Sequence, residues 1–381
     1  MANILFEGFD VIQNPANLAL VHDNFVGTLF PTFPTGRTAN ASSNCIQVEG
    51  IGLDRLRGAT STPADRWGIG MGYSISNMTV GVFTPDTRKT LIELFDGGST
   101  QLRIVVIESD GPANINKIKL RAENGPFASP STLGPDSAWI DVGENIWNYI
   151  EVDATISLTG TVIVKVDNVE VINISGANLR ISGTDQADAV EYTIGSNAGS
   201  PSPIVKMDDL YAINNDSSSG LDMDVTGLLG PVAVEGIRAT NVGDLTDWSS
   251  SSGAANHLML QDVAEGIDHD VTFVKTALIN DKELYEFQNP VQPSPTNPVI
   301  TLEFVVAARK ASPGSNRDLQ FRYRDNSNFD ASMAGVVTVV SEISNQYDVL
   351  KKSYAGNPLN SNNPWTKDNL DNGQFGFELV S

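Results

Sequence analysis

The segment Glu151-Val152-Asp153-Ala154-Thr155 places two carboxylates two residues apart in an alternating pattern. On a β-strand, residues i and i+2 point to the same side, so both acids would face one substrate. Retaining glycoside hydrolysis needs two carboxyl groups about 5–5.5 Å apart, whereas strand positions i and i+2 stand about 6.6–7 Å apart. Thr155 takes the next place on that face and supplies no third acid. We therefore predict a protein that is not an enzyme, with a solvent-facing polar stripe at this strand.

Other catalytic or metal-binding patterns are absent from the sequence. The three histidines are far apart and show no zinc-ligand spacing. Neither a Gly-x-Ser-x-Gly elbow nor a phosphate-binding loop is present. The single cysteine, Cys45, rules out an internal disulfide and a thiolate metal site, and we predict that it is a small buried side chain.

Charge and hydropathy restrict the partners that the chain can have. With 24 basic and 46 acidic residues, the net charge is −22, which disfavours nucleic acid and an anionic membrane surface. No run of about 18 apolar residues predicts a membrane-spanning helix. The first ten residues, MANILFEGFD, lack the basic and apolar regions of a signal peptide, so we expect synthesis in the cytoplasm.

Short alternating segments must position these side chains. In Thr161–Val166, three valines fall on one face, and Asp167-Asn168 then turns the chain into a second strand. Thr90–Phe95 and Leu102–Ile107, joined through a Gly-rich loop, predict another hairpin. Helical periodicity is nearly confined to Thr366–Leu370. We predict an all-β protein built as sandwiches.

The length of 381 residues suits two domains. The polar stretch Asn214–Gly220 is the best boundary between strand-rich halves. We predict a first domain over 1–215, a linker over 216–228 and a second β domain over 229–381. Pro290–Pro298 carries four prolines and predicts an extended crossing between strands.

Several segments of the first half follow one known pattern. An aromatic-led strand begins at Trp147, and a hairpin runs from Gly160 to Asn168. Asp208-Asp209-Leu210-Tyr211 has the form of the closing strand of this pattern, and Phe6–Asp10 has the form of its opening strand. This order resembles the laminin-G-like and concanavalin-like jelly roll. The resemblance implies an N-terminal jelly-roll β-sandwich. In such folds, Ca²⁺ often binds between the opening segment and the closing strand, which here would involve Glu7, Asp10 or Asp208.

The second half extends the resemblance. Leu228-Leu229-Gly230 follows the spacer, Trp248 lies in a Ser-rich loop, Pro364-Trp365-Thr366 comes near the end, and Phe375–Leu379 forms a last strand. This succession resembles structural proteins of tailed-bacteriophage virions, with tail, neck, fibre and capsid-decorating members. The resemblance implies a virion location, docking onto other virion proteins, and a homo-oligomer in which a trimer is favoured.

A carbohydrate-binding adhesion module is the alternative function. In that case, loops at one end of the jelly roll would contact a host glycan through aromatic, Asp and Asn side chains. Trp248 is the best stacking candidate, because a loop can present it. Arg322 and Arg324 share the outer face of one strand, either as a solvated stripe or as contacts to an acidic neighbouring subunit.

Overall fold

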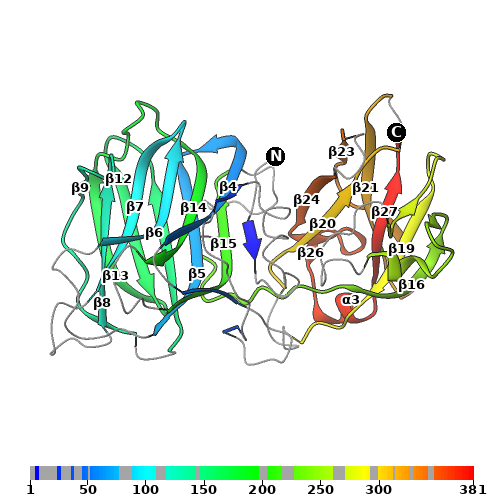
Figure 1. The fold of residues 1–381 in the computed structure, drawn as a ribbon, viewed down its shortest axis with the longest axis horizontal. Coiled ribbons are helices and arrows are strands. Elements are labelled where there is room, and N and C mark those ends of the chain that lie inside the picture. The colour runs from blue at the N-terminus through cyan, green and yellow to red at the C-terminus, as the bar shows by residue number, and fades with distance from the viewer. Residues whose placement is uncertain are drawn as a thin grey trace. The chain divides into compact units, whose positions relative to one another are not determined.

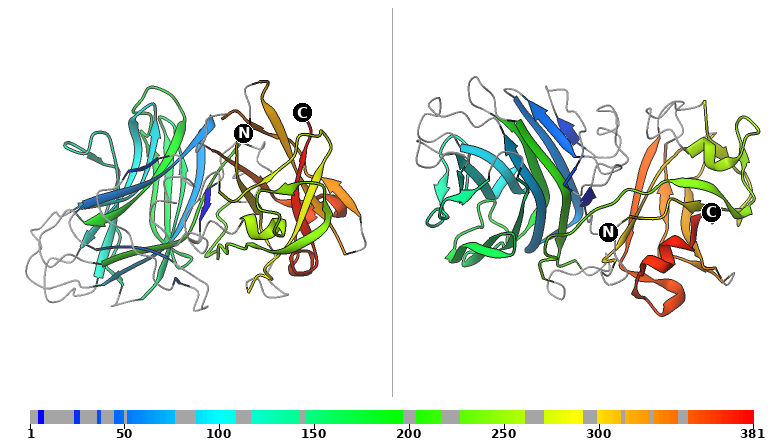
Figure 2. Two further views of the ribbon diagram at one scale, coloured as in Figure 1. Left: turned by 45° about the vertical axis from the view of Figure 1, so that its right-hand side comes forward. Right: turned by 90° about the horizontal axis from the view of Figure 1, so that it is seen from below.

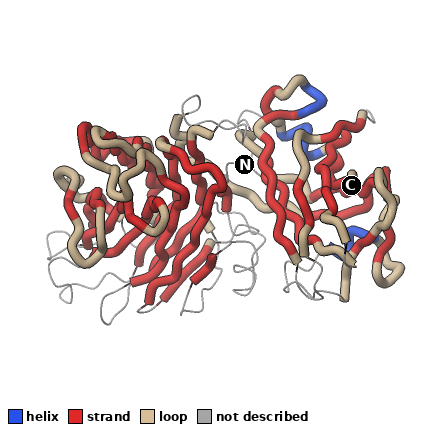
Figure 3. Tube along the Cα trace, turned by 90° about the horizontal axis from the view of Figure 1, so that it is seen from above, coloured by secondary structure: helices blue, strands red, loops and turns tan. Residues whose placement is uncertain are grey.

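The structure is a computed structural model of the 381-residue chain, and it is built almost entirely from strands (Figures 1 and 3). Contacts divide the described residues into two units, the first ending at Val234 and the second beginning at Glu235. The residues that the structure describes are 5–7, 24–26, 36–37, 45–49, 52–76, 88–108, 117–142, 146–196, 204–216, 227–260, 271–291, 299–311, 314–326, 329–341 and 347–381.

A seven-stranded antiparallel sheet forms one layer of the first unit, the expected jelly-roll sandwich. The predicted closing strand, β15, lies between the opening strand β1 and the long strand β5. On its other side β5 pairs with β11, which in turn pairs with β12. The strands of this sheet are β1 (Leu5–Glu7), β3 (Ile46–Glu49), β5 (Arg66–Ser76), β11 (Asn148–Thr155), β12 (Gly160–Val166), β13 (Val169–Ala177) and β15 (Ile204–Asn214).

An eight-stranded sheet forms the other layer, and Figure 2 shows the two sheets stacked. Its central order is β8-β7-β6-β14-β4, so segments far apart in the sequence become neighbours. Its strands are β2 (Asn24–Val26), β4 (Gly52–Ala64), β6 (Arg88–Asp96), β7 (Ser99–Glu108), β8 (Lys117–Asn124), β9 (Ser131–Thr132), β10 (Ile140–Asp141) and β14 (Ala187–Ser196).

Strict alternation explains why these segments pack as two layers. Val162 and Val164, which the alternation places on one face of β12, are fully buried, and so are Ile150 and Val152 of β11. The Tyr192 hydroxyl of one sheet donates to the Tyr211 carbonyl of the other at 2.6 Å, which joins the layers inside the core. Apolar side chains of both inner faces therefore form one core.

Both predicted hairpins of the first unit are confirmed. Asp167 and Asn168 have φ of 49° and 66°, the left-handed values that a two-residue type I′ turn requires. Gly97 and Gly98 turn the chain between β6 and β7, also with positive φ. Cys45 is buried as expected, and burial raises the pKa of its thiol to about 12.

The boundary between the units lies downstream of the predicted linker. Residues 229–234, which the sequence assigns to the second domain, belong to the first unit. Their backbone amides bond to side chains of the seven-stranded sheet. The predicted Pro290–Pro298 crossing lies mostly outside the described residues.

The second unit is the expected second β domain. A six-stranded sheet contains β16 (Ala239–Thr246), β19 (Lys282–Phe287), β21 (Arg317–Arg324), β22 (Asp330–Ser332), β23 (Val337–Val339) and β27 (Gln374–Leu379). Three two-stranded pairs accompany it: β17 (Ser249–Ser250) with β18 (Val274–Lys275), β20 (Leu302–Ala308) with β24 (Asp348–Tyr354), and β25 (Gly356–Asn357) with β26 (Asn363–Pro364).

An aromatic core holds the second unit together. Phe304 of β20 packs on Phe321 of β21, with ring centroids 5.0 Å apart, and Tyr323 stacks on Phe375 at the same distance. The predicted short helix is present as α3 (Lys367–Asp371), capped by the Thr366 side chain. Among the described residues, no helix has the length and apolarity of a membrane span.

Candidate functional site

Glu151 and Asp153 lie on the outer face of the seven-stranded sheet, but they form no catalytic pair. Glu151 is only 1% exposed and accepts hydrogen bonds from the Tyr211 hydroxyl at 2.6 Å and the Gly230 amide at 2.8 Å. Asp153 is paired with the Arg66 guanidinium at 3.0 Å. The predicted solvent-facing stripe is therefore wrong at Glu151, because the segment after β15 folds back and covers it.

A glycine in β5 leaves the space through which the Tyr211 side chain reaches Glu151. The three strands lie in the order β15-β5-β11, with Tyr211, Gly70 and Glu151 in register. A Cβ atom at Gly70 would lie 2.1 Å from the Tyr211 ring. Because Gly70 has no side chain, the ring crosses β5 and its hydroxyl reaches the carboxylate beyond.

Asp209 anchors the same covering segment nearer the unit boundary. Its carboxylate accepts the Val234 amide at 2.7 Å and pairs with the Arg37 guanidinium at 2.7 Å. Burial raises the pKa of Asp209, and the Arg37 charge opposes that rise. Glu151 and Asp209 therefore both hold backbone segments in place, and neither of these carboxylates is directed at a ligand.

The residues expected to hold Ca²⁺ are only partly described. Both carboxylate oxygens of Asp208 accept backbone amides, from Arg37 at 2.7 Å and from Asp209 at 2.8 Å. Asp10 and the side chain of Glu7 lie outside the described residues. Within the described ranges, no three His, Cys, Asp or Glu side chains gather as a metal site would require. Calcium binding stays a prediction.

Trp248 is half-buried against the core of the second unit. Its ring meets Phe377 edge-on, with centroids 4.8 Å apart, and its indole N–H donates to the Asp281 carbonyl at 3.2 Å. The Trp248 amide also donates to Glu283 at 3.1 Å. The loop thus holds the ring against the sheet, and a glycan contact by Trp248 stays a prediction.

Arg322 and Arg324 are paired with acids of the same chain. Arg322 is 7% exposed and contacts Asp330 at 2.5 Å and Glu378 at 2.9 Å, so it is not part of a solvated stripe. Arg324 pairs with Asp244 at 3.2 Å. These pairs lie within one chain: Asp330 and Glu378 come from the strands next to β21, and Asp244 comes from β16. Contact of these two arginines with a partner subunit or a glycan stays a prediction.

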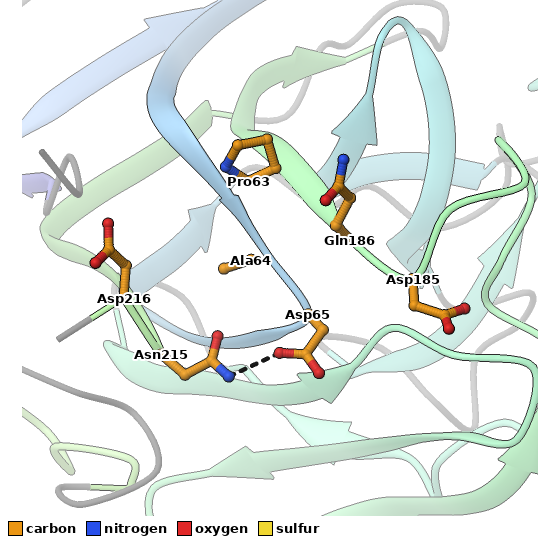
Figure 4. A pocket seen from close by; sticks show the side chains of 7 residues that line it. All are labelled: Pro63, Ala64, Asp65, Asp185, Gln186, Asn215 and Asp216. Atoms are coloured by element: carbon orange, nitrogen blue, oxygen red, sulfur yellow. Dashed lines mark hydrogen bonds between the residues drawn. The ribbon is translucent and has the colours of Figure 1, made fainter.

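A polar pocket of about 380 Å³ opens at one end of the first unit (Figure 4). Three chain segments meet there: the turn between β4 and β5, the segment entering β14, and the residues directly after β15. The lining residues are Pro63, Ala64, Asp65, Asp185, Gln186, Asn215 and Asp216.

Carboxylates and amides dominate the pocket wall. Figure 4 shows Asn215 and Asp216 on one side, Asp185 and Gln186 on the other, and Asp65 between them. The Asn215 amide nitrogen donates to Asp65 at 2.7 Å, and Arg180 pairs with Asp185 at 3.4 Å. Carboxylates accept hydrogen bonds from hydroxyl groups, and primary amides both donate to hydroxyl groups and accept from them. The three acids disfavour an anionic ligand.

A row of charged residues crosses the outer face of the eight-stranded sheet. Registers place Arg57 opposite Glu191, Glu191 opposite Glu93, Glu93 opposite Arg103, and Arg103 opposite Glu123. Glu93, Arg103, Glu123 and Glu191 are each less than 8% exposed. Arg103 pairs with Glu93 at 2.5 Å, and Arg55, from the same face of β4, pairs with Glu191 at 3.3 Å.

Neither the pocket nor the charged row was predicted from the sequence. Charged residues between core positions, such as Glu93 between Ile92 and Leu94, are a local signal for the row. Its assembly from five strands depends on registers between distant segments. The pocket likewise joins residues near 64, 186 and 215, which no local motif connects.

No model of a known protein family matches the chain, and no curated protein matches its sequence. Among solved structures, the chain is similar to the alginate lyase Aly36B, with 10% identity over 56% of this chain and 98% of that chain and a TM-score of 0.41. A carbohydrate esterase from the Shiga toxin-encoding bacteriophage phi24B matches with 9% identity over 55% and 98% of the chains and a TM-score of 0.36.

Domain 4 of AbnA, a GH43 extracellular arabinanase from Geobacillus stearothermophilus, solved in complex with arabinotriose, matches with 14% identity over 55% and 92% of the chains and a TM-score of 0.33. At these TM-scores, the likeness does not bear on function, which depends on the side chains of this chain.

Proposed function

We propose that the protein is a carbohydrate-binding adhesion component of a tailed-phage virion and performs no chemical step. The end pocket of the first unit carries the carbohydrate part of this proposal. Its wall combines carboxylates and primary amides, the groups that form paired hydrogen bonds with sugar hydroxyls. This matches the expectation of Asp and Asn contacts from loops at one end of the jelly roll, although the described lining contains no aromatic ring.

The charges of the pocket indicate which sugars it accepts. Asp65, Asp185 and Asp216 surround a space of about 380 Å³, and the chain carries a net charge of −22. A carboxylated or sulfated sugar would be repelled there, so the ligand of this pocket is a neutral or amino sugar. The pocket is open to solvent at its exposed residues Asp65 and Asp185, so the end of a glycan chain can enter.

The pocket is tested with a glycan array of neutral and amino sugars and the double variant Asp185→Ala/Gln186→Ala. Removing both groups deletes hydrogen bonds worth about 1 kcal/mol or more each, so we expect at least about a tenfold loss of affinity for the best ligand. Asp141→Ala is the matched control, because Asp141 has a side chain 81% exposed and lies outside the pocket. Unchanged binding by the double variant, or no retained glycan, contradicts the proposal.

The virion location is supported by the order of sequence segments that resembles phage structural proteins. Docking onto other virion proteins and assembly as a trimer belong to the same proposal. Immunogold labelling of purified particles tests the location, and light scattering of the purified chain tests the oligomer. Absence of the protein from washed particles contradicts the virion role and leaves glycan binding as a separate question.

A further inference from the structure

We propose that β20 of the second unit is a contact surface for a second copy of this chain, whose own β20 pairs with it edge to edge as an antiparallel strand. The proposal concerns assembly and rests on neither the end pocket nor glycan binding. β20 pairs with β24 on one side, as Figure 1 shows, and within the described residues no strand pairs with its other side.

β20 lacks the features that protect the other sheet edges. An open edge presents unpaired backbone N–H and C=O groups, and proteins usually shorten, bend or charge such strands. The edge strands β1, β2, β10 and β22 have only two or three residues each. Register shifts interrupt the pairing of β13 and β16, and β24 carries Lys351 and Lys352. β20 pairs with β24 over seven residues without a shift, so it offers a regular edge.

Two apolar side chains are exposed on the outer face of β20. Val305 is 48% exposed, and Ala307 is also exposed. Phe304 and Val306 point the other way and pack against the core of the second unit. A β-branched side chain in the middle of a regular strand loses exposure when another strand is added beside it, because cross-strand neighbours lie in contact.

Opposite charges flank this apolar pair. Glu303 comes two residues before the pair and Arg309 two residues after it, so all four side chains share one face of the extended chain. The Arg309 guanidinium lies 5.7 Å from the centroid of the Tyr347 ring, and these two residues would be the next pair in the β20–β24 register. Arg309 therefore continues the face, although it lies one residue beyond the strand.

The order of these residues makes β20 complementary to an antiparallel copy of itself. When two copies pair about Val306, Glu303 of each lies opposite Arg309 of the other. Val305 then lies opposite Ala307 of the other copy, so two ion pairs flank two apolar pairs. Opposite charges across a strand pair are stabilising, and like charges are destabilising. Pairing about any other residue separates these charges, so the register about Val306 is favoured.

A second copy is the partner because its charges match those of β20. With a net charge of −22, two copies repel one another over most of their surfaces, so a contact between them needs a place where opposite charges meet. A copy of β20 carries an arginine six positions after a glutamate, which is the spacing that both ion pairs require. An unrelated strand has no reason to carry that spacing.

The contact is twofold and therefore differs from the contacts within the proposed trimer. It gives a dimer by itself, and it gives a hexamer when it joins two trimers. Sedimentation velocity of the full chain measures the mass at roughly 1–100 µM, since so small a contact gives weak association. We expect a dimer or a hexamer whose mass halves on dilution. A monomer or a trimer at every concentration overturns this contact, whereas a dimer overturns the trimer alone.

Reversal of the charges tests the ion pairs. Glu303→Arg places two arginines opposite each other in both pairs, so we expect association to weaken at least about tenfold. Glu303→Arg/Arg309→Glu restores opposite charges and should recover the association. Glu170→Arg makes the same change in net charge at an exposed position of β13 and is the matched control. Equal association of Glu303→Arg and the control, or no recovery in a double variant that melts normally, overturns the proposal.

Cross-linking tests the register independently. In the proposed pairing, the Cβ atoms of Val305 and of Ala307 in the other copy are about 4.5–5.5 Å apart, near the separation that a disulfide requires. Chains with Val305→Cys and chains with Ala307→Cys should form a disulfide-linked dimer when they are mixed. Both positions are exposed, whereas the native Cys45 is buried. No cross-link in the mixture, or an equal yield from Val305→Cys alone, overturns this pairing.

Discussion

At Glu151, a buried carboxylate is held by two donors from different parts of the chain. The Tyr211 hydroxyl comes from β15, and the Gly230 amide comes from the segment that follows the sandwich. Both bonds end on the same oxygen, Oε1. This residue therefore joins the sheet to the covering segment, and its role is structural.

Replacing Glu151 should destabilise the first unit. Glu151→Ala leaves the Gly230 amide and the Tyr211 hydroxyl without their acceptor, which costs about 1–3 kcal/mol. Glu151→Gln retains an acceptor oxygen and should cost less. Urea unfolding followed by tryptophan fluorescence measures both, with Glu170→Ala at an exposed position of β13 as the control. An Ala variant as stable as the control would show that the two bonds contribute nothing.

The β12–β13 hairpin shows how a single turn sets the pairing of an element. Asp167 and Asn168 both adopt positive φ, and the Asp167 carboxylate accepts the Tyr149 amide of β11 at 2.8 Å. The turn is therefore tied to the next strand as well as to its own hairpin. Asn tolerates this backbone conformation better than most residues, and glycine tolerates it best.

Substitution at Asn168 should separate backbone strain from side-chain contacts. Asn168→Val places a β-branched residue at φ 66° and should lower the free energy of unfolding by about 1–2 kcal/mol. Asn168→Gly should be nearly neutral, because glycine adopts the same φ without strain. Equilibrium denaturation compares the two variants. If both behave alike, the left-handed turn is not what limits the choice of residue.

Over the whole molecule, the first unit extends beyond its last strand. The segment 227–234 donates backbone amides to Tyr211, Glu151 and Asp209, so it completes the outer face of the seven-stranded sheet. A fragment ending at 215 lacks these bonds, whereas a fragment ending at 234 retains them.

The two fragments should therefore differ in thermal stability. Each lost hydrogen bond contributes about 1 kcal/mol, and each kcal/mol changes Tm by about 2–4 °C in a domain of this size. Calorimetry of fragments 1–215 and 1–234 measures the difference, and the full chain provides the reference. Equal melting temperatures would place the domain boundary at 215, as the composition of the linker predicts.

The sequence predicted those features that depend on local pattern. The hairpin at Asp167-Asn168, the alternation in β11 and the Thr366 cap are each encoded within a few residues, and each is present. The contacts of Glu151 were not predictable, because the Gly230 amide returns from 79 positions away. Arg57 and Arg103 become members of one row only through the strand order of the sheet, which alternation does not specify.

The returning segment also determines how a mechanical load enters the sandwich. Tension along the chain from the second unit arrives at Val234, whose amide is bonded to Asp209, and then at Gly230, whose amide is bonded to Glu151. These two anchors, and then the Leu229 amide bonded to the Tyr211 hydroxyl, stand in series along the chain before β15 itself is pulled. A load applied through the second unit would thus release a short length of chain before any strand is peeled from the sheet.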